Sequence, residues 1–405
     1  MNLAAPHIRI KCRPEDFVVT ETAELKPRKT GTHTLYRLTK RGWNTVSALQ
    51  EIAQRTGNDF EHFAYGGKKD KYALTSQYFT VEGRHRAIKL DEDGLRVEAL
   101  GRLDRPMGPD LIVENVFAIV VRDLTRGLPE ALARLEGLAR RGLENYFDDQ
   151  RFGGYDPEQG FLAEKVLKDH LNGAVKWLVT AQDPEDTDED RARKALFFER
   201  WKDWEACRQA ARTPYERKVF YHLCRRRSDF FGILKEIPRE RLSLAIAAYQ
   251  ASIWNELLRR ILLERAGASA AESFDVNPGL NGEYLFCRQD AAARALEGLD
   301  LPTLAAKTVF ADKRAESIHE GILSEIGVER PMFNKMKLRQ AYFKSFPRPA
   351  RIVPRNLSWK EGPDDLYAGA SKLELSFALP RGSYATMLLK RLFAVPARPA
   401  GLGEG

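Results

Sequence analysis

Long apolar runs and secretion signals are absent from this 405-residue sequence. No stretch approaches the roughly 18 consecutive apolar residues of a membrane-spanning helix. The N-terminal residues, MNLAAPHIRIKCRPEDF, lack the charged start, apolar centre and cleavage site of a secretory signal. These absences argue against a typical membrane or secreted protein, and we expect a cytoplasmic protein that does not contact a membrane.

Metal-binding and nucleophile motifs are missing as well. The four cysteines, Cys12, Cys207, Cys224 and Cys287, form no C-x-x-C pair, so the sequence predicts neither a zinc site nor a disulfide framework. The seven histidines occur in no H-E-x-x-H motif and accompany no nucleophile elbow. Serine-type hydrolysis therefore has no support, and we expect no metal and no other cofactor.

What the sequence does contain is ordinary globular composition with a basic bias. Hydrophobic residues make up 43% and charged residues 30% of the chain, as in a protein that folds around a core. The length predicts two domains, or one domain that carries a large insertion. A net charge of +8 favours a polyanionic partner such as nucleic acid, although many basic proteins bind none.

Hydrophobic periodicity divides the chain into strand-rich ends and a helical middle. Short alternating stretches predict strands from Ile8 to about Leu124, interrupted by a helix from Val46 to Arg55 and followed by one from Leu128 to Leu143. Strand-like alternation returns in residues 372–377. The helices predicted in the middle are Phe161 to Leu178, Arg191 to Ala211, Pro214 to Arg226 and Leu242 to Ala266.

This division predicts an α+β fold with a mixed or antiparallel sheet. We expect both chain ends, residues 1–154 and 351–405, to form one domain. The mainly helical residues 155–350 would be an insertion within it.

One segment combines positive charge with aromatic rings. Between Pro331 and Lys360 there is no Asp or Glu. The cations in it are Lys335, Lys337, Arg339, Lys344, Arg348, Arg351, Arg355 and Lys360, and the interleaved rings are Phe333, Tyr342, Phe343, Phe346 and Trp359. This mixture is expected where a groove follows phosphates and stacks unpaired bases. The alternative is a solvated basic face whose rings belong to the core.

The densest candidate for chemistry is a glycine turn followed by a carboxylate between lysines. Residues 65–77 read YGGKKDKYALTSQ, with Asp70 between Lys69 and Lys71, and the spacing of a phosphate-binding loop is absent. Neighbouring lysines would lower the pKa of Asp70, which suits a nucleophile or an electrostatic stabiliser better than a proton donor. Taken alone, the motif is also consistent with a charged hairpin turn.

A second candidate segment, residues 142–153 (GLENYFDDQRFG), follows a predicted helix. Its amide, aromatic and guanidinium groups are of the kinds that read and stack a base or hold a phosphate, although they would equally pin a loop. Asp148 and Asp149 suggest a metal or a carboxylate pair, but no third and fourth ligands are recognisable nearby.

Four separated segments together resemble the TruD family of pseudouridine synthases. They are K-C-R-P-E-D-F-V-V from Lys11, G-K-K-D-K-Y-A-L-T-S-Q from Gly67, N-Y-F with Q-R-F-G from Asn145, and L-P-R-G-S-Y-A-T from Leu379. A helix with A-Y-Q-A-S-I-W-N from Ala248 resembles a further family element. The match runs through nearly the whole chain and departs from the family pattern at residues 66, 148 and 149.

The resemblance implies a pseudouridine synthase catalytic domain formed by the two chain ends, with the TruD-type insertion between them. It implies that Asp70 is the catalytic carboxylate and that Phe17, Asn145 and Tyr384 contact the substrate. We hypothesise that the two aromatic rings wall a flipped base while Asn145 hydrogen-bonds to it.

Further contacts are expected around this carboxylate. Lys11 and Lys69 would orient Asp70 or bind the adjoining phosphate. Additional substrate contacts are expected from Phe147, Gln150 and Arg151, and contacts to the RNA backbone from Lys335, Lys337, Arg339 and Lys344.

The implied activity is isomerisation of a uridine to pseudouridine, with uridine 13 of tRNA as the usual target of bacterial family members. The alternatives are a catalytically silent RNA-binding protein, a pseudouridine synthase that acts on another RNA, and a nuclease that uses Asp148 and Asp149. A metal chelator would inhibit only the nuclease. The expected partner is tRNA; no protein partner is implied, and a monomer is the default expectation.

Overall fold

The computed structural model describes residues 8–183, 186–267, 270–334, 338 and 342–397. The chain divides into two compact units. The first unit comprises Met1–Glu144 with Ile352–Val395, and the second comprises Asn145–Arg351 with Pro396–Gly405. None of the helices in the described part of the chain combines the length and the apolar composition needed to span a bilayer.

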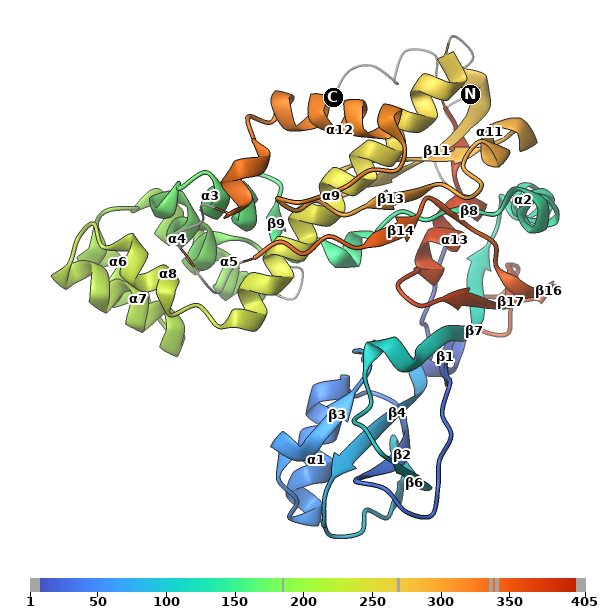
Figure 1. Ribbon diagram of the computed structural model, residues 1–405, viewed down its shortest axis with the longest axis horizontal. Helices are drawn as coiled ribbons and strands as arrows, with labels where there is room; N and C mark the ends of the chain where they lie inside the picture. Colours follow the sequence, from blue (N-terminus) through green and yellow to red (C-terminus); the bar gives the residue numbers. More distant parts are fainter. Residues whose placement is uncertain (1–7, 184–185, 268–269, 335–337, 339–341, 398–405) are drawn as a thin grey trace. The chain divides into compact units, whose positions relative to one another are not determined.

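The first unit is built on one large sheet. Its strands are β1 (Phe17–Ala23), β2 (His33–Lys40), β3 (Phe63–Tyr65), β4 (Leu74–Glu82), β5 (Leu90–Glu92), β6 (Leu95–Leu103), β7 (Ile112–Leu124), β16 (Arg355–Pro363) and β17 (Ser371–Pro380). The spatial order is β16-β17-β7-β1-β4-β2-β6-β5, with β3 paired to β4. Figure 1 shows the C-terminal strands β16 and β17 in red and the N-terminal strand β1 in blue. Because β17 pairs with β7, the C-terminal segment joins the sheet that the N-terminal segment begins. The remaining elements are α1 (Thr45–Thr56), α2 (Leu128–Arg141), β8 (Leu143–Glu144) and α13 (Ala385–Leu392).

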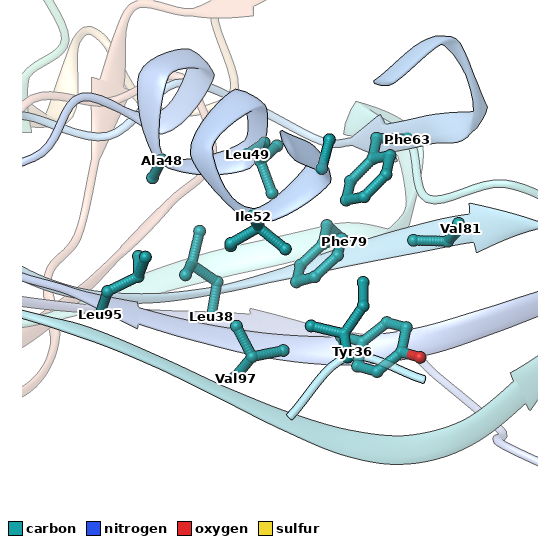
Figure 2. Packing of buried hydrophobic residues seen from close by; sticks show 12 residues of the cluster. Tyr36, Leu38, Ala48, Leu49, Ile52, Phe63, Phe79, Val81, Leu95 and Val97 are labelled. Carbon is teal, nitrogen blue, oxygen red and sulfur yellow. The ribbon is translucent and has the colours of Figure 1, made fainter. Parts of the chain in front are cut away.

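Helix α1 covers one part of this sheet and forms a core with it. The side chain of Asn44 caps its first turn by accepting a hydrogen bond from a backbone amide (2.8 Å). Leu49 and Ile52 of α1 face Leu38 and Phe79 of the strands (Figure 2), and all four side chains are completely buried. Each such burial contributes about 1.5–3 kcal/mol to stability.

The parallel direction of β1 and β4 brings together the two chain segments that precede these strands. Strands β1 and β4 run parallel, with Val18 opposite Leu74. Neighbouring parallel strands start at the same end of a sheet. The segment that precedes Phe17 therefore meets the loop that precedes Leu74, which carries Asp70.

The second unit is mainly helical. Its helices are α3 (Leu162–Leu167), α4 (Leu171–Thr180), α5 (Asp188–Glu199), α6 (Trp204–Ala210), α7 (Pro214–Arg225), α8 (Phe230–Lys235), α9 (Arg239–Ala266), α10 (Ala270–Ser273), α11 (Asp290–Arg294) and α12 (Lys313–Glu325). Its strands are β9 (Tyr155–Asp156), β10 (Gly160–Phe161), β11 (Phe274–Gly279), β12 (Gly282–Cys287), β13 (Asp300–Pro302) and β14 (Pro347–Pro349). Two further short strands, β15 (Arg351–Ile352) and β18 (Val395–Pro396), lie where the chain passes from one unit to the other.

Two predicted helices of this unit are each divided in two. The helix predicted over 161–178 is α3 and α4, because Asp169 between them has a left-handed backbone (φ 59°). The helix predicted over 191–211 is α5 and α6, separated at Lys202 (φ 85°). A positive φ interrupts the helical ladder, whereas the apolar pattern continues past it. The paired strands β11 and β12 are an addition that the periodicity did not predict.

A histidine on α12 is buried in this unit. His319 is 1% exposed and packs against Phe310, with ring centres 4.9 Å apart. Burial lowers the pKa of His319 to about 4; the Glu320 carboxylate opposes this change, and the Arg330 guanidinium adds to it. The imidazole is therefore neutral in the folded protein near neutral pH.

We predict that this histidine makes the fold sensitive to mild acid. The unfolded chain, with a histidine pKa of about 6.5, binds a proton between pH 6.5 and 4 that the folded chain does not bind. The contribution of His319 is therefore complete above pH 6.5 and is lost as the pH falls toward 4, about 2 kcal/mol between pH 7 and pH 5. Urea unfolding at both pH values should show a smaller pH-dependent loss for His319→Leu. The same pH dependence in His319→Leu as in wild type would refute the prediction, and exposed His62→Leu is the matched control.

Candidate active site

Asp70 lies in an irregular loop between β3 and β4. Its Oδ1 accepts a hydrogen bond from the Tyr72 amide (2.8 Å). Its Oδ2 pairs with Nζ of Lys11, from the segment before β1. The Asp70 side chain keeps 29% of its surface exposed, so a carboxylate with fixed orientation remains accessible to a ligand.

The surroundings of Asp70 favour its charged form. Burial alone would raise the pKa of Asp70. The hydrogen bonds from Lys11 and the Tyr72 amide, together with the charges of Lys11 and Lys40, outweigh burial and hold the pKa below its ordinary value. Asp70 is therefore an anion at neutral pH, the state that suits a nucleophile or an electrostatic stabiliser.

Phe17 stands beside this ion pair. Nζ of Lys11 lies 4.7 Å from the centre of the Phe17 ring, within the range of a cation–π contact. The ring itself is 6% exposed and meets Phe117 edge-on, with centres 6.4 Å apart. The structure thus brings together three of the predicted site residues, Lys11, Phe17 and Asp70.

Lys69, which was predicted to orient Asp70 or to bind a phosphate, has other partners. Its Nζ lies 2.8 Å from Oε2 of Glu21 and 2.7 Å from Oδ1 of Asn115. The Glu21 side chain is buried, and a buried carboxylate requires a cation. Of the two predicted lysines, Lys11 therefore orients Asp70, whereas the ammonium of Lys69 joins its loop to β1 and β7.

Tyr384 follows β17 and precedes α13. Glu21, Asn115 and Leu379 occupy adjacent positions on β1, β7 and β17. Lys69, in the Asp70 loop, contacts Glu21 and Asn115. Leu379, from which the chain continues to Tyr384, therefore lies in the same row of the sheet as these two residues.

Three buried polar side chains hold the backbone of the Asp70 loop. They are Lys40, Thr45 and Gln77, at most 1% exposed, and each hydrogen-bonds to a backbone group between Gly67 and Asp70. Lys40 was not among the predicted site residues. A signal existed, because Lys40 continues the alternation of buried Tyr36 and Leu38 on β2.

In the second unit, Asn145 is fixed by β14 and the residue after it. Nδ2 of Asn145 donates to the Pro349 carbonyl (3.0 Å), and its backbone amide donates to the Ala350 carbonyl (2.9 Å). Oδ1 of Asn145 accepts a hydrogen bond from Arg348 (2.8 Å). The amide predicted to read a base is therefore held in one orientation.

Arg348 is buried, contrary to its assignment to an RNA-binding surface. It is 6% exposed, donates to the carbonyls of Asn145 (2.9 Å) and Tyr146 (3.2 Å), and lies 4.0 Å from the centre of the Phe147 ring. A guanidinium with these partners organises the segment that contains Asn145 instead of meeting phosphates.

Phe147 belongs to the core of the second unit. It is 5% exposed, meets Trp254 of α9 edge-on with ring centres 5.5 Å apart, and exchanges two backbone hydrogen bonds of 2.8 Å with the side chain of Asn255. Because Phe147 is buried in this core, it supports the segment that contains Asn145.

Residues 148–151 make hydrogen bonds with one another and with the β11–β12 hairpin. Gln150 donates to Oδ2 of Asp148 (3.0 Å), and Oδ1 of Asp149 accepts from the hydroxyl of Tyr284 (2.7 Å) and from a backbone amide of the β11–β12 turn. Gln150 and Arg151 line a cavity of about 510 Å³ within the second unit. Among the described residues, no group of three His, Cys, Asp or Glu side chains is arranged to hold a metal.

The basic segment is described only in part. Lys335, Lys337 and Arg339 lie outside the described residues. Lys344 is exposed, and its carbonyl accepts hydrogen bonds from Gln250 (3.2 Å) and Thr303 (3.3 Å). The backbone of Lys344 is therefore fixed by hydrogen bonds, while its side chain is exposed at the surface.

The mixed sheet joined by both chain ends, together with the helical insertion, defines the α+β fold class of TruD-type pseudouridine synthases. A crystal structure described as a putative tRNA pseudouridine synthase D from Methanosarcina mazei has this fold, with a TM-score of 0.71 at 24% identity; the match covers 97% of this chain and 94% of that one. The predicted fold class is thereby confirmed.

The chain belongs to the tRNA pseudouridine synthase D (TruD) family, whose model matches residues 4–392. It is 30% identical to the probable tRNA pseudouridine synthase D of Methanopyrus kandleri, over 89% of this chain and 86% of that protein. It is 28% identical to the tRNA pseudouridine synthase D of Aquifex aeolicus, over 95% and 98% of the two chains. The resemblance drawn from four sequence segments is therefore confirmed.

We predict that Lys11→Gln raises the pKa of Asp70, because this substitution removes both a charge and the strongest hydrogen bond to the carboxylate. The measurement is a pH titration of the aspartate side-chain carboxyl signals by ¹³C NMR, with Asp70→Asn used to assign the signal. Lys71→Gln, which removes an adjacent charge that lies over the Tyr72 ring, is the matched control. An unchanged Asp70 titration in Lys11→Gln would rule out the role given to Lys11.

Proposed function

We propose that this protein converts a uridine of tRNA, at position 13, to pseudouridine, with Asp70 as the reacting carboxylate. The observation that carries the proposal is an aspartate that is ionised, paired with Lys11 and still partly exposed. The names of the relatives, tRNA pseudouridine synthase D, support the reaction and the class of RNA.

The reaction explains why a single carboxylate is sufficient. Pseudouridine formation breaks the bond from ribose C1′ to uracil N1, turns the base, and joins C5 to C1′ before the C5 proton leaves. No outside atom is added. The enzyme has to extract the nucleotide from its stack, supply the carboxylate, retain the free uracil and keep water from the sugar. An ionised Asp70 fits attack on the ribose, assistance of elimination to a glycal, or addition to the base.

The other predicted site residues have separate tasks in this proposal. Lys11 keeps Asp70 ionised and presents positive charge next to the nucleotide phosphate. Phe17 and Tyr384 wall the base. Asn145 is the residue assigned to hydrogen-bond with the base through its side-chain amide.

The basic segment would hold the folded RNA by its backbone. Lys344 is exposed, and the cations at 335, 337 and 339 precede it within ten residues. Phosphate contacts fix the position of an RNA without reading its sequence. We therefore propose that the insertion, which was predicted over residues 155–350 and which the second unit extends to Asn145–Arg351, holds the RNA, and that the first unit, which contains Asp70, carries the chemistry.

Asp70→Asn should reduce the rate of pseudouridine formation by on the order of 10⁴-fold or more. An amide can still accept the hydrogen bond from the Tyr72 amide but cannot supply the negative charge. Purified protein is incubated with unmodified tRNA, without metal or cofactor, and pseudouridine is mapped at single-nucleotide resolution. Binding is measured in parallel by filter retention, and Asp91→Asn, a 77% exposed carboxylate of the same unit, is the control. Turnover by Asp70→Asn would remove Asp70 from the role of reacting group, and product at another position would correct the target.

Neutralising the basic segment should weaken RNA binding and flatten its salt dependence. For the combined substitution of Lys335, Lys337, Arg339 and Lys344 by Gln, the slope of log affinity against log salt should decrease by about 0.7–0.9 for each phosphate that the variant no longer neutralises. The control removes four cations that are more than half exposed, Arg28, Arg96, Arg191 and Lys313. Equal slopes for both variants would show that total charge, and not this segment, determines binding.

A further inference from the structure

The last residue of β2 is a lysine in the protein core. Tyr36, Leu38 and Lys40 point to the same side of the strand, which α1 covers, and the first two line the core in Figure 2. Lys40 is completely buried. An ammonium group without partners would be very unfavourable at such a position, so its contacts must compensate for the lost hydration.

Those contacts are three backbone carbonyls. Nζ of Lys40 donates to the carbonyls of Trp43 (2.7 Å), Asp70 (2.8 Å) and Lys69 (3.3 Å). An ammonium group has three N–H donors and no acceptor, so the number of partners matches. Two of the three carbonyls belong to the loop that presents Asp70, and the third precedes the start of α1.

Two more buried side chains complete this arrangement. Thr45, the first residue of α1, accepts a hydrogen bond from the Lys69 amide (2.8 Å) and donates to Oε1 of Gln77 (2.8 Å). Nε2 of Gln77, on β4, donates to the Gly67 carbonyl (3.0 Å). Residues 67–70 form no helix or strand, so these side chains replace the backbone partners that regular structure would supply.

We propose that Lys40, with Thr45 and Gln77, is a positioning group for pseudouridine synthesis, one that fixes the backbone from which Asp70 projects without touching the substrate. This inference rests on the proposed function. Because Lys40, Thr45 and Gln77 come from β2, α1 and β4, the clamp ties the Asp70 loop to three elements of a rigid core.

The charge of Lys40 has a second effect at the same site. Although burial lowers the pKa of Lys40 to about 8, the ammonium is still mainly protonated near neutral pH. Its charge is one of the influences that lower the pKa of Asp70. A methionine of similar length would fill the same space but would leave three carbonyls without a donor and the carboxylate without this charge.

The test is a single-turnover comparison of Lys40→Met with wild type on unmodified tRNA. A displacement of about 1 Å at a reacting group can cost 10²-fold in rate, so the rate constant should fall about 100-fold while the Kd for tRNA stays within about twofold. Lys40→Gln, which keeps two N–H donors, should recover part of this loss. Lys29→Met, an exposed lysine of the same unit, is the control and should react at the wild-type rate.

Each outcome decides the inference. Folded Lys40→Met that reacts at the wild-type rate overturns it, and so does an equal loss of rate and of tRNA affinity, which would indicate general disruption. If thermal unfolding shows that Lys40→Met is not folded, Thr45→Val takes its place, because this substitution removes the hydrogen bond to the Lys69 amide. Its single-turnover rate constant and its Kd for tRNA then decide the inference. A wild-type protein that makes no pseudouridine in any tRNA contradicts the proposed function instead, and this result is known before the variants are compared.

Discussion

The parallel pairing of β1 with β4 is the constraint on which the site depends. Every other strand pair of this sheet within the described residues is antiparallel. Antiparallel neighbours would bring the start of one strand to the end of the other. The parallel pair instead brings together two starts, so Lys11 and Phe17 meet a loop that follows more than fifty residues later. The ion pair between Lys11 and Asp70 exists only because of this strand direction.

Ion pairs of the P-E-D-F segment, residues 14–17, fix the position of Lys11 and Phe17 relative to the sheet. Asp16 is 2% exposed and pairs with Arg122 of β7 (2.7 Å), while its other oxygen accepts a hydrogen bond from the Arg13 amide (3.0 Å). The same Arg122 also pairs with Asp364 (2.9 Å), which lies just after β16. A buried arginine thus holds the segment before Phe17 to β7 and to the C-terminal part of the chain. Breaking a buried ion pair on one side costs about 3–5 kcal/mol, so this segment cannot shift easily relative to Asp70.

The sequence allowed the strands and α1 to be predicted because alternation and a capping residue are local features, and it singled out the loop of Asp70 as a candidate because glycine and charge are concentrated there. It did not allow the breaks at Asp169 and Lys202 to be predicted, because a single left-handed residue leaves the apolar pattern intact. The partners of Lys69 and the burial of Lys40 were missed for a different reason. The charge of a lysine does not show whether its side chain is exposed, and most partners of these two lysines lie on other strands or loops, at sequence distances that no local pattern encodes.

The burial of several cations means that the net charge of +8 does not measure the positive charge at the surface. Lys40, Arg122, Arg348 and Arg391 are each at most 6% exposed, and each has carbonyl or buried carboxylate partners within the fold, such as Glu144 for Arg391. These cations contribute to the sum but cannot exchange protein partners for phosphates without leaving buried groups unsatisfied. Positive charge that a polyanion can reach has to come from exposed side chains, so it has to be located on the surface and not counted along the chain. A basic composition is consequently a weaker sign of RNA binding than a basic surface over an anchored backbone.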